Sequence, residues 1–146
     1  MNLQHHYTQL LKHHLSGVET PVIGAWDDDQ YIITYDYFTA FLCPKNRFPF
    51  DIPTVFPNGV SDQFASLFRH SSDAIHARLT DDLKITVDGK IVRRITDGLT
   101  DVWVNEKLLK PYKPTSFVIL GPKSPIAIYE GDTFVGAVLP VRMPTV

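Results

Sequence analysis

The residues of this sequence best suited to metal or nucleophilic chemistry are six histidines and one cysteine. Four of the histidines fall in one short segment, at His5, His6, His13 and His14. If that segment is a helix, His6 and His13 lie about 10 Å apart along its axis, too far to share one zinc ion without further ligands. The sequence contains no His-x-x-x-His pair and no second cysteine. We therefore predict no metal site and no cofactor, and expect the histidines at the surface or at helix caps.

The thiol of Cys43 is the most reactive nucleophile available, but its setting argues against catalysis. It precedes Pro44 at the end of an apolar stretch where the sequence supplies no base, so a buried structural thiol is the better interpretation. The acidic run Asp27–Asp29 lacks the glycine and distal glutamate of a calcium loop. Neither a Gly-x-Ser-x-Gly motif nor a phosphate-binding glycine loop is present. We predict that the chain is not an enzyme.

Two other groups of residues are better suited to binding. Lys107, Lys110 and Lys113 belong to a short basic stretch that can contact nucleic-acid phosphates. The formal net charge of −2 is far from the basic bias of a dedicated nucleic-acid binder. We therefore expect weak binding of nucleic acid at most, with a solvated basic face as the alternative.

The second group is the segment Pro44–Pro57, in which four prolines are interspersed with Phe48, Phe50 and Phe56. Prolines at this density oppose regular structure, which predicts an extended arm or long connection. Its phenylalanines either fold back onto the domain or bury themselves in a partner. We expect at least one of the three to be buried.

Composition sets the class of protein. The 146 residues are 44% hydrophobic and 21% charged, which is typical of one globular domain. No apolar run is long enough for a transmembrane helix, so we expect no membrane partner. A single cysteine allows no internal disulfide, and the first residues lack the pattern of a signal peptide. These features predict a cytoplasmic protein.

The elements that must position these residues begin with an amphipathic helix over residues 3–15, capped by Asn2 and ended by Gly17. A strand over 21–26 and one long or bent strand over 31–43 follow. Ser61 is expected to cap a short helix, and Asp88-Gly89 to turn a hairpin between 83–87 and 90–95. The remaining predicted elements are a strand over 101–104, a helix over 107–112 capped by Asn105, and strands over 115–120, 125–129 and 133–138.

The last third of the chain resembles the C-terminal part of the bacterial sliding clamp, the β subunit of DNA polymerase III. The residues that carry the resemblance are Val104-Asn105, Leu108-Leu109, Ser124-Pro125 and Leu139-Pro140-Val141-Arg142-Met143. An internal echo supports it, because Leu10-Leu11-Lys12 and Leu108-Leu109-Lys110 each precede predicted strands that end at a proline. The family chain carries three such domains, whereas this chain has room for one.

The resemblance implies an α+β fold, a DNA-clamp-like domain of two helix-plus-strands units that form antiparallel sheet with helices on one face. The units would span about 1–44 and 74–146 of a single domain over 1–146, joined by a Pro/Phe-rich connection over 45–73. In the family, the final strand and tail line a shallow apolar pocket for short peptides of partner proteins. The corresponding peptide-binding residues here would be Leu139, Pro140, Val141, Arg142 and Met143.

Two functions from different classes follow. The first is a non-enzymatic clamp-like binding module of DNA replication or repair, which binds protein peptides and, weakly, DNA. The alternative is a protein-interaction or inhibitor module, of phage or mobile-element origin, that keeps the fold without encircling DNA and uses the Pro/Phe arm as its main contact. A small enzyme with a site formed only in three dimensions is held in reserve. A one-domain chain would need to form a homo-oligomer to close around DNA.

Overall fold

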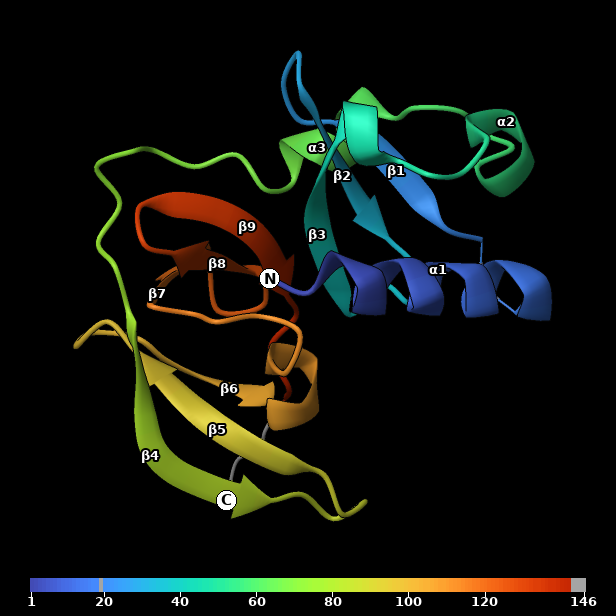
Figure 1. The fold of residues 1–146 in the computed structure, drawn as a ribbon. Coiled ribbons are helices and arrows are strands. Elements are labelled where there is room, and N and C mark those ends of the chain that lie inside the picture. The colour runs from blue at the N-terminus through green and yellow to red at the C-terminus, as the bar shows by residue number, and fades with distance from the viewer. Residues whose placement is uncertain (19, 143–146) are drawn as a thin grey trace. The chain divides into compact units, whose positions relative to one another are not determined.

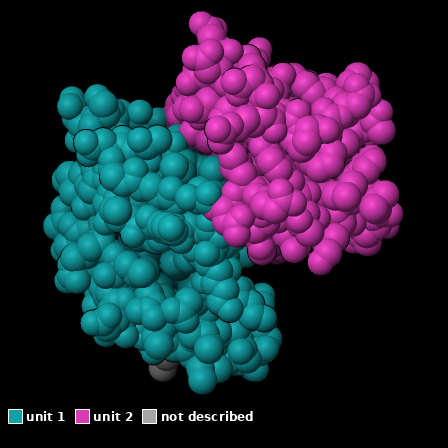
Figure 2. Space-filling view, in the orientation of Figure 1, with its two compact units in different colours: residues 1, 70–146 teal, residues 2–69 magenta. Residues whose placement is uncertain are grey.

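The computed structural model describes residues 1–18 and 20–142, which fold into two compact units (Figures 1 and 2). The first unit comprises residues 2–69, and the second comprises residues from 70 onward together with Met1. Short helices and antiparallel strands make up both units, which confirms the predicted α+β class. The Pro/Phe-rich stretch from 45 to 69 belongs to the first unit.

The first unit begins with the helix that the sequence predicts, α1 (Leu3–Ser16). The Asn2 side chain accepts a hydrogen bond from the His5 N–H, and Gly17 ends the helix with φ of 66°, the left-handed conformation that glycine adopts without strain. The helix buries His6 and Leu10. Three antiparallel strands follow it: β1 (Val22–Ala25), β2 (Gln30–Thr34) and β3 (Thr39–Pro44).

The predicted long strand over 31–43 is wrong, because the chain reverses at residues 35–38 and forms the β2–β3 hairpin. One carboxylate oxygen of Asp36 accepts hydrogen bonds from the N–H groups of Phe38 and Thr39. Tyr37 takes a positive φ of 65°. The hydrophobic pattern conceals this turn because apolar and aromatic residues continue through it without a glycine or proline.

The prolines of segment 44–57 do not prevent regular structure, contrary to the prediction of an extended arm. The segment contains a 3-10 turn, η1 (Lys45–Arg47), and a short helix, α2 (Ile52–Val55). Pro53 lies in the first turn of α2, where a missing N–H costs no helical hydrogen bond.

The next helix, α3 (Asp62–Ser66), starts at the predicted cap: the Ser61 hydroxyl accepts a hydrogen bond from the Phe64 N–H at 3.1 Å. The helix packs against β1, and a Cβ atom on Gly24 would lie only 2.9 Å from the Ser61 carbonyl oxygen. Glycine at this position therefore permits the close approach of helix and strand.

The second unit contains two sets of antiparallel strands. One is β4 (Arg78–Ile85), β5 (Ile91–Thr96) and β6 (Asp101–Asn105). The other is the meander of β7 (Ser116–Ile119), β8 (Ile126–Glu130) and β9 (Thr133–Val138). The predicted Asp88-Gly89 turn is confirmed, since Gly89 has φ of 85° and its N–H donates to the Thr86 carbonyl at 2.9 Å.

The helix that the sequence predicts over 107–112 is shorter and of a different type. It is the 3-10 helix η2 (Glu106–Leu109), whose first turn is capped by the Asn105 side chain accepting from the Lys107 N–H. Pro111 and Pro114 limit its length, because a proline has no N–H with which to continue the helical hydrogen bonding. Leu109 of η2 joins the core of the unit with Ile95, Val102, Val104, Tyr112, Phe117, Ile126 and Ile128.

Candidate functional site

The residues that follow β9 line a hollow in the second unit. Leu139, Pro140, Val141 and Arg142 form one wall, and the start of β6 and the turn at Pro122 and Lys123 form the other. The hollow has a volume of about 820 Å³. We call it the tail groove; its lining residues are Asp101, Val102, Trp103, Pro122, Lys123, Leu139, Pro140, Val141 and Arg142.

The sequence explains why the chain changes direction here. Pro140 has no N–H to donate, so the β8–β9 ladder ends with β9 at Val138 and the following residues leave it. The chain then meets β6, where the Val141 N–H donates to the Trp103 carbonyl at 2.7 Å. Leu139, Pro140 and Val141 are half-buried, and Arg142 is exposed. The groove therefore has an apolar floor with charged groups at its edge.

Trp103 is the largest of the groove residues that the sequence did not nominate. Val102 and Val104 point into the core, so strand alternation places Trp103 on the opposite face of β6. The Lys84 ammonium lies 4.7 Å from the centroid of the Trp103 ring, a cation–π contact that helps to hold the ring. The alternation over 101–104 was the signal that could have found it, since a large aromatic ring on the outer face of a strand needs a partner.

Four of the five peptide-binding residues that the resemblance implies are therefore gathered at one hollow. The fifth, Met143, lies outside the described residues.

The three lysines nominated for DNA are all exposed, but the structure does not place them alike. Lys107 and Lys110 line a second hollow of about 370 Å³ together with Lys90 of the β4–β5 hairpin. Lys113 lies outside this lining, and its backbone N–H donates to the Glu130 carboxylate at 2.7 Å. We call the second hollow the lysine hollow.

Two acidic side chains also line the lysine hollow, and each has a basic partner. Glu106 accepts from the Arg93 guanidinium at 2.5 Å, and Asp88 lies 3.4 Å from the Lys90 ammonium. Pairing offsets the two negative charges, so Lys107 and Lys110 leave the hollow with a modest positive field.

The three phenylalanines of segment 44–57 pack within the first unit. Phe56 is only 1% exposed, which confirms that at least one of them is buried. The Phe48 ring lies 5.7 Å from Tyr31 and 5.9 Å from Phe56, and Phe50 lies 6.2 Å from Tyr7, measured between ring centroids. These rings contribute to the aromatic packing of their own unit, and a role toward a partner stays a prediction.

Cys43 is a buried free thiol, as expected. Its sulfur lies 3.0 Å from the Tyr7 hydroxyl oxygen. Burial raises the pKa of the Cys43 thiol, so the nucleophilic thiolate is disfavoured at neutral pH.

The expectation of surface or capping histidines is wrong for His6, which is fully buried. Its ring stacks on Phe41 with centroids 4.4 Å apart, and its Nδ1 lies 3.0 Å from the Tyr35 hydroxyl oxygen. Burial lowers the pKa of His6 to about 3, so the ring is neutral at physiological pH. The amphipathic pattern could have revealed this, because His6 lies four residues before the buried Leu10 on the same helix face.

A second pair of histidines meets serine and tyrosine on β7 and β8. His76 Nδ1 lies 2.7 Å from the Ser116 hydroxyl oxygen, and His70 shares a hydrogen bond with the Tyr129 hydroxyl. Ser116 and Tyr129 are partners in the β7–β8 register. No sequence motif joins the four residues, and they line neither hollow described above. We assign them the role of fastening residues 70–76 to the meander.

No group of three or more potential metal ligands gathers anywhere in residues 1–18 and 20–142. In the same ranges, no helix combines the length and the apolar character needed to cross a bilayer. Comparisons with protein families, curated proteins and solved structures give no match to this chain. The similarity to the sliding clamp therefore stays a prediction that rests on the residues quoted for it.

Proposed function

We propose that this chain is a non-enzymatic, clamp-like binding module of DNA replication or repair in the cytoplasm, which holds short segments of partner proteins in the tail groove. One observation carries the proposal. The residues that the clamp resemblance nominates for peptide binding, Leu139 to Arg142, line a hollow that also contains a tryptophan.

The chemistry of the groove favours an apolar peptide with a polar end. Trp103, Leu139 and Val141 offer apolar surface, and burying one leucine or phenylalanine side chain against such surface is worth about 1.5–3 kcal/mol. Lys123 and Arg142 supply donors at the edge of the groove. A segment that combines a glutamine with a following leucine and phenylalanine matches both properties.

Binding of a fluorescent peptide of this type tests the proposal. We expect micromolar affinity, about −8 kcal/mol. Val141→Asp should weaken binding more than tenfold, because it puts a carboxylate on the apolar floor. Leu99→Asp is the matched control: Leu99 is 90% exposed and does not line the groove, so affinity should not change.

Tryptophan fluorescence provides a direct second measurement. The chain has two tryptophans, so Trp26→Phe leaves Trp103 as the only reporter, and its emission should shift when peptide enters the groove. Absence of both signals at high micromolar protein would remove the peptide-binding function. Binding that Val141→Asp leaves intact would place the peptide elsewhere.

Nucleic acid is the second partner that we propose, with lower affinity. The lysine hollow supports it, since Lys107 and Lys110 form no ion pair within residues 1–18 and 20–142 and can contact phosphates. The modest charge of this surface favours weak, salt-sensitive binding.

A further inference from the structure

Strand β4 leaves an apolar row exposed at the open edge of its sheet. Leu83 is 50% exposed, Ile85 76% exposed, and Val87 of the following turn fully exposed. β4 pairs with β5 on one side. On the other side of β4, Ala77, which lies just before the strand, pairs with Phe117 of β7. Within residues 1–18 and 20–142 this is the pairing found on that side. The second half of β4 is thus an edge that the described chain leaves uncovered (Figure 1).

The backbone of this edge is oriented for pairing. The Thr86 N–H donates to the Lys90 carbonyl across the hairpin, so Thr86 faces β5. Successive residues of a strand direct their backbone groups to alternate edges. The N–H and C=O groups of Leu83 and Ile85 therefore point away from β5, toward the open side.

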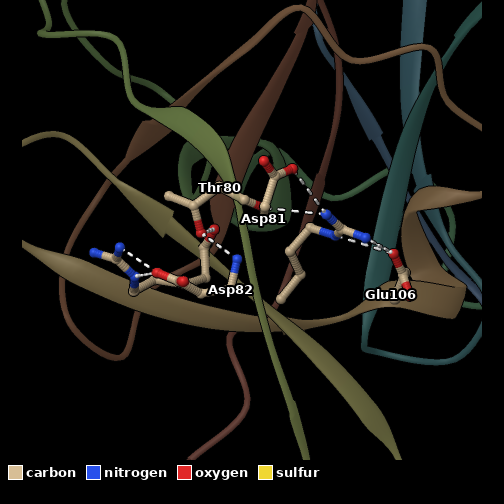
Figure 3. A network of polar contacts seen from close by, with 6 residues as sticks. Thr80, Asp81, Asp82 and Glu106 are labelled. Carbon is tan, nitrogen blue, oxygen red and sulfur yellow. Dashed lines mark hydrogen bonds and ion pairs between the residues drawn. The ribbon is translucent and has the colours of Figure 1, made fainter.

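A polar network holds the strand just before this edge (Figure 3). The register of β4 and β5 shifts between Leu79 and Leu83, which marks a bulge. Within it, the Thr80 hydroxyl donates to the Arg94 carbonyl at 2.9 Å and accepts from the Asp82 N–H at 3.2 Å. The Arg94 guanidinium forms an ion pair with Asp82. These contacts limit the freedom of the strand before Leu83, which lowers the entropy lost when the edge pairs.

We propose that β4 of one copy pairs antiparallel with β4 of a second copy, about a twofold axis at Leu83. In this register the two Leu83 residues face each other and exchange both backbone hydrogen bonds. Asp82 of each copy then lies opposite Lys84 of the other, so the dimer gains two pairs of opposite charge. The row of exposed apolar side chains is shared between the two strands.

Charge complementarity selects this register over its neighbours. A twofold axis at Asp82 would place the Asp82 residues of the two chains opposite each other, and an axis at Lys84 would do the same for Lys84. In both cases like charges would be in contact. A twofold axis at Ile85 would place Asp82 opposite Asp88 of the second copy. Like charges directly opposite on paired strands are destabilising. The Leu83 register alone among these four joins opposite charges.

The edge is short, which predicts a weak dimer with a dissociation constant in the micromolar range. Sedimentation equilibrium of the full chain, from low micromolar to about 1 mM, should show a reversible monomer–dimer equilibrium. Leu83→Lys should shift the midpoint more than tenfold toward monomer. Leu99→Lys, at an exposed leucine in the β5–β6 turn, should leave it unchanged.

A charge swap tests the register itself. Asp82→Lys alone and Lys84→Asp alone each oppose like charges in the dimer, and each should weaken it. The double variant restores opposite pairs across the axis but lacks the Asp82–Arg94 ion pair of each copy, so it should dimerise more tightly than either single variant without reaching the parent chain. Melting curves of all variants check that each folds.

Disulfide trapping gives an independent measurement. Because Cys43 is buried, Leu83→Cys introduces the one accessible thiol. Directly opposite residues of a hydrogen-bonded pair have Cα atoms about 5.5 Å apart, within disulfide range. Oxidation should give a covalent dimer for Leu83→Cys and far less for Asp88→Cys.

Three results would overturn the proposal. They are a chain that stays monomeric up to about 1 mM, a dimer that Leu83→Lys leaves intact, and a charge-swap double variant that dimerises no more tightly than either single variant. If the chain dimerises only after removal of residues 143–146, those residues, and not a second copy, would be the occupant of the β4 edge. That result would also overturn the proposal. A second protein that binds this edge while the chain alone stays monomeric would do the same.

Discussion

The segment Pro44–Pro57 and the tail Leu139–Arg142 look alike in sequence, but the structure places them in different surroundings. Both combine proline with large apolar residues, and both are candidates for partner binding on that ground. The first segment buries Phe56 and packs Phe48 and Phe50 on neighbouring rings. The tail instead lines an open hollow beside Trp103. Apolar residues next to prolines therefore indicate a break in regular structure, whereas what covers them decides between core and binding surface.

Truncation of Phe56 should have the largest effect on the difference between the two segments. Phe56→Ala should lower the free energy of unfolding by about 3–5 kcal/mol, because it removes a fully buried ring and leaves a cavity. Phe48→Ala and Phe50→Ala should cost less, since both side chains are half-buried. Urea titrations of the three variants measure the differences. If the Phe56→Ala chain is as stable as the parent, Phe56 contributes nothing to the core and the segment is again a candidate partner-binding arm.

The packed interior of the first unit should also be sensitive to acid through His6. Its pKa is about 3 in the folded state and 6.5 in a model peptide, so the unfolded chain binds the proton more readily. Stability attributable to His6 is therefore complete above pH 6.5 and is lost as the pH falls toward 3. Between pH 6.5 and 5 the loss should be about 2 kcal/mol.

His6→Phe is the matched variant for this measurement, since it keeps an aromatic ring against Phe41 and removes the titration. Subtracting its pH–stability curve from that of the parent cancels the contribution of carboxylates common to both. A difference that stays flat between pH 6.5 and 5 would contradict the buried, neutral His6.

On the tail side, truncation should separate binding from stability. Val141→Ala should cost about 1 kcal/mol of stability or less, because the side chain is only half-buried. It should lower the affinity for the Gln/Leu/Phe peptide about fivefold, a comparable free energy on the binding side. Thermal melts and fluorescence anisotropy of the same sample give both values. A large fall in melting temperature would show that Val141 contributes to the core, as Phe56 does, and that the tail is not a free binding surface.

The smallest effect on stability is expected at the three lysines, because their exposed side chains take no part in core packing. Changing Lys107, Lys110 and Lys113 to glutamate should leave the melting temperature nearly unchanged and further weaken the DNA binding, which remains measurable at low salt. If all three contact phosphates, the salt slope of binding should decrease by roughly 2.7, about 0.9 for each contact. A decrease near 1.8 would agree with Lys107 and Lys110 lining one hollow and Lys113 lying outside it. Parent protein that shows no retention at low salt would remove nucleic acid from the proposal.

Short-range signals account for the parts of the fold that the sequence predicts correctly. Asn2, Ser61 and Asn105 are each found capping the helical turn that follows them. Asp88-Gly89 turns its hairpin as expected, and the strands of the C-terminal third lie close to their predicted bounds. Caps and tight turns are contacts between residues only a few positions apart, so the residue types are enough to recognise them. The α+β class follows from the sum of such elements.

Which of these elements cover one another depends on contacts between distant parts of the chain. Trp103 and Val141 are far apart in sequence and meet through a backbone hydrogen bond that no local pattern encodes. The turn at Asp36 lies inside an apolar run, and the burial of His6 depends on Phe41 and Tyr35 arriving from the β2–β3 hairpin. Hydrophobicity is non-directional, so a sequence can show that a side chain needs cover without showing which segment supplies it. That is why the same residue types form a closed core around Phe56 and an open groove beside Val141.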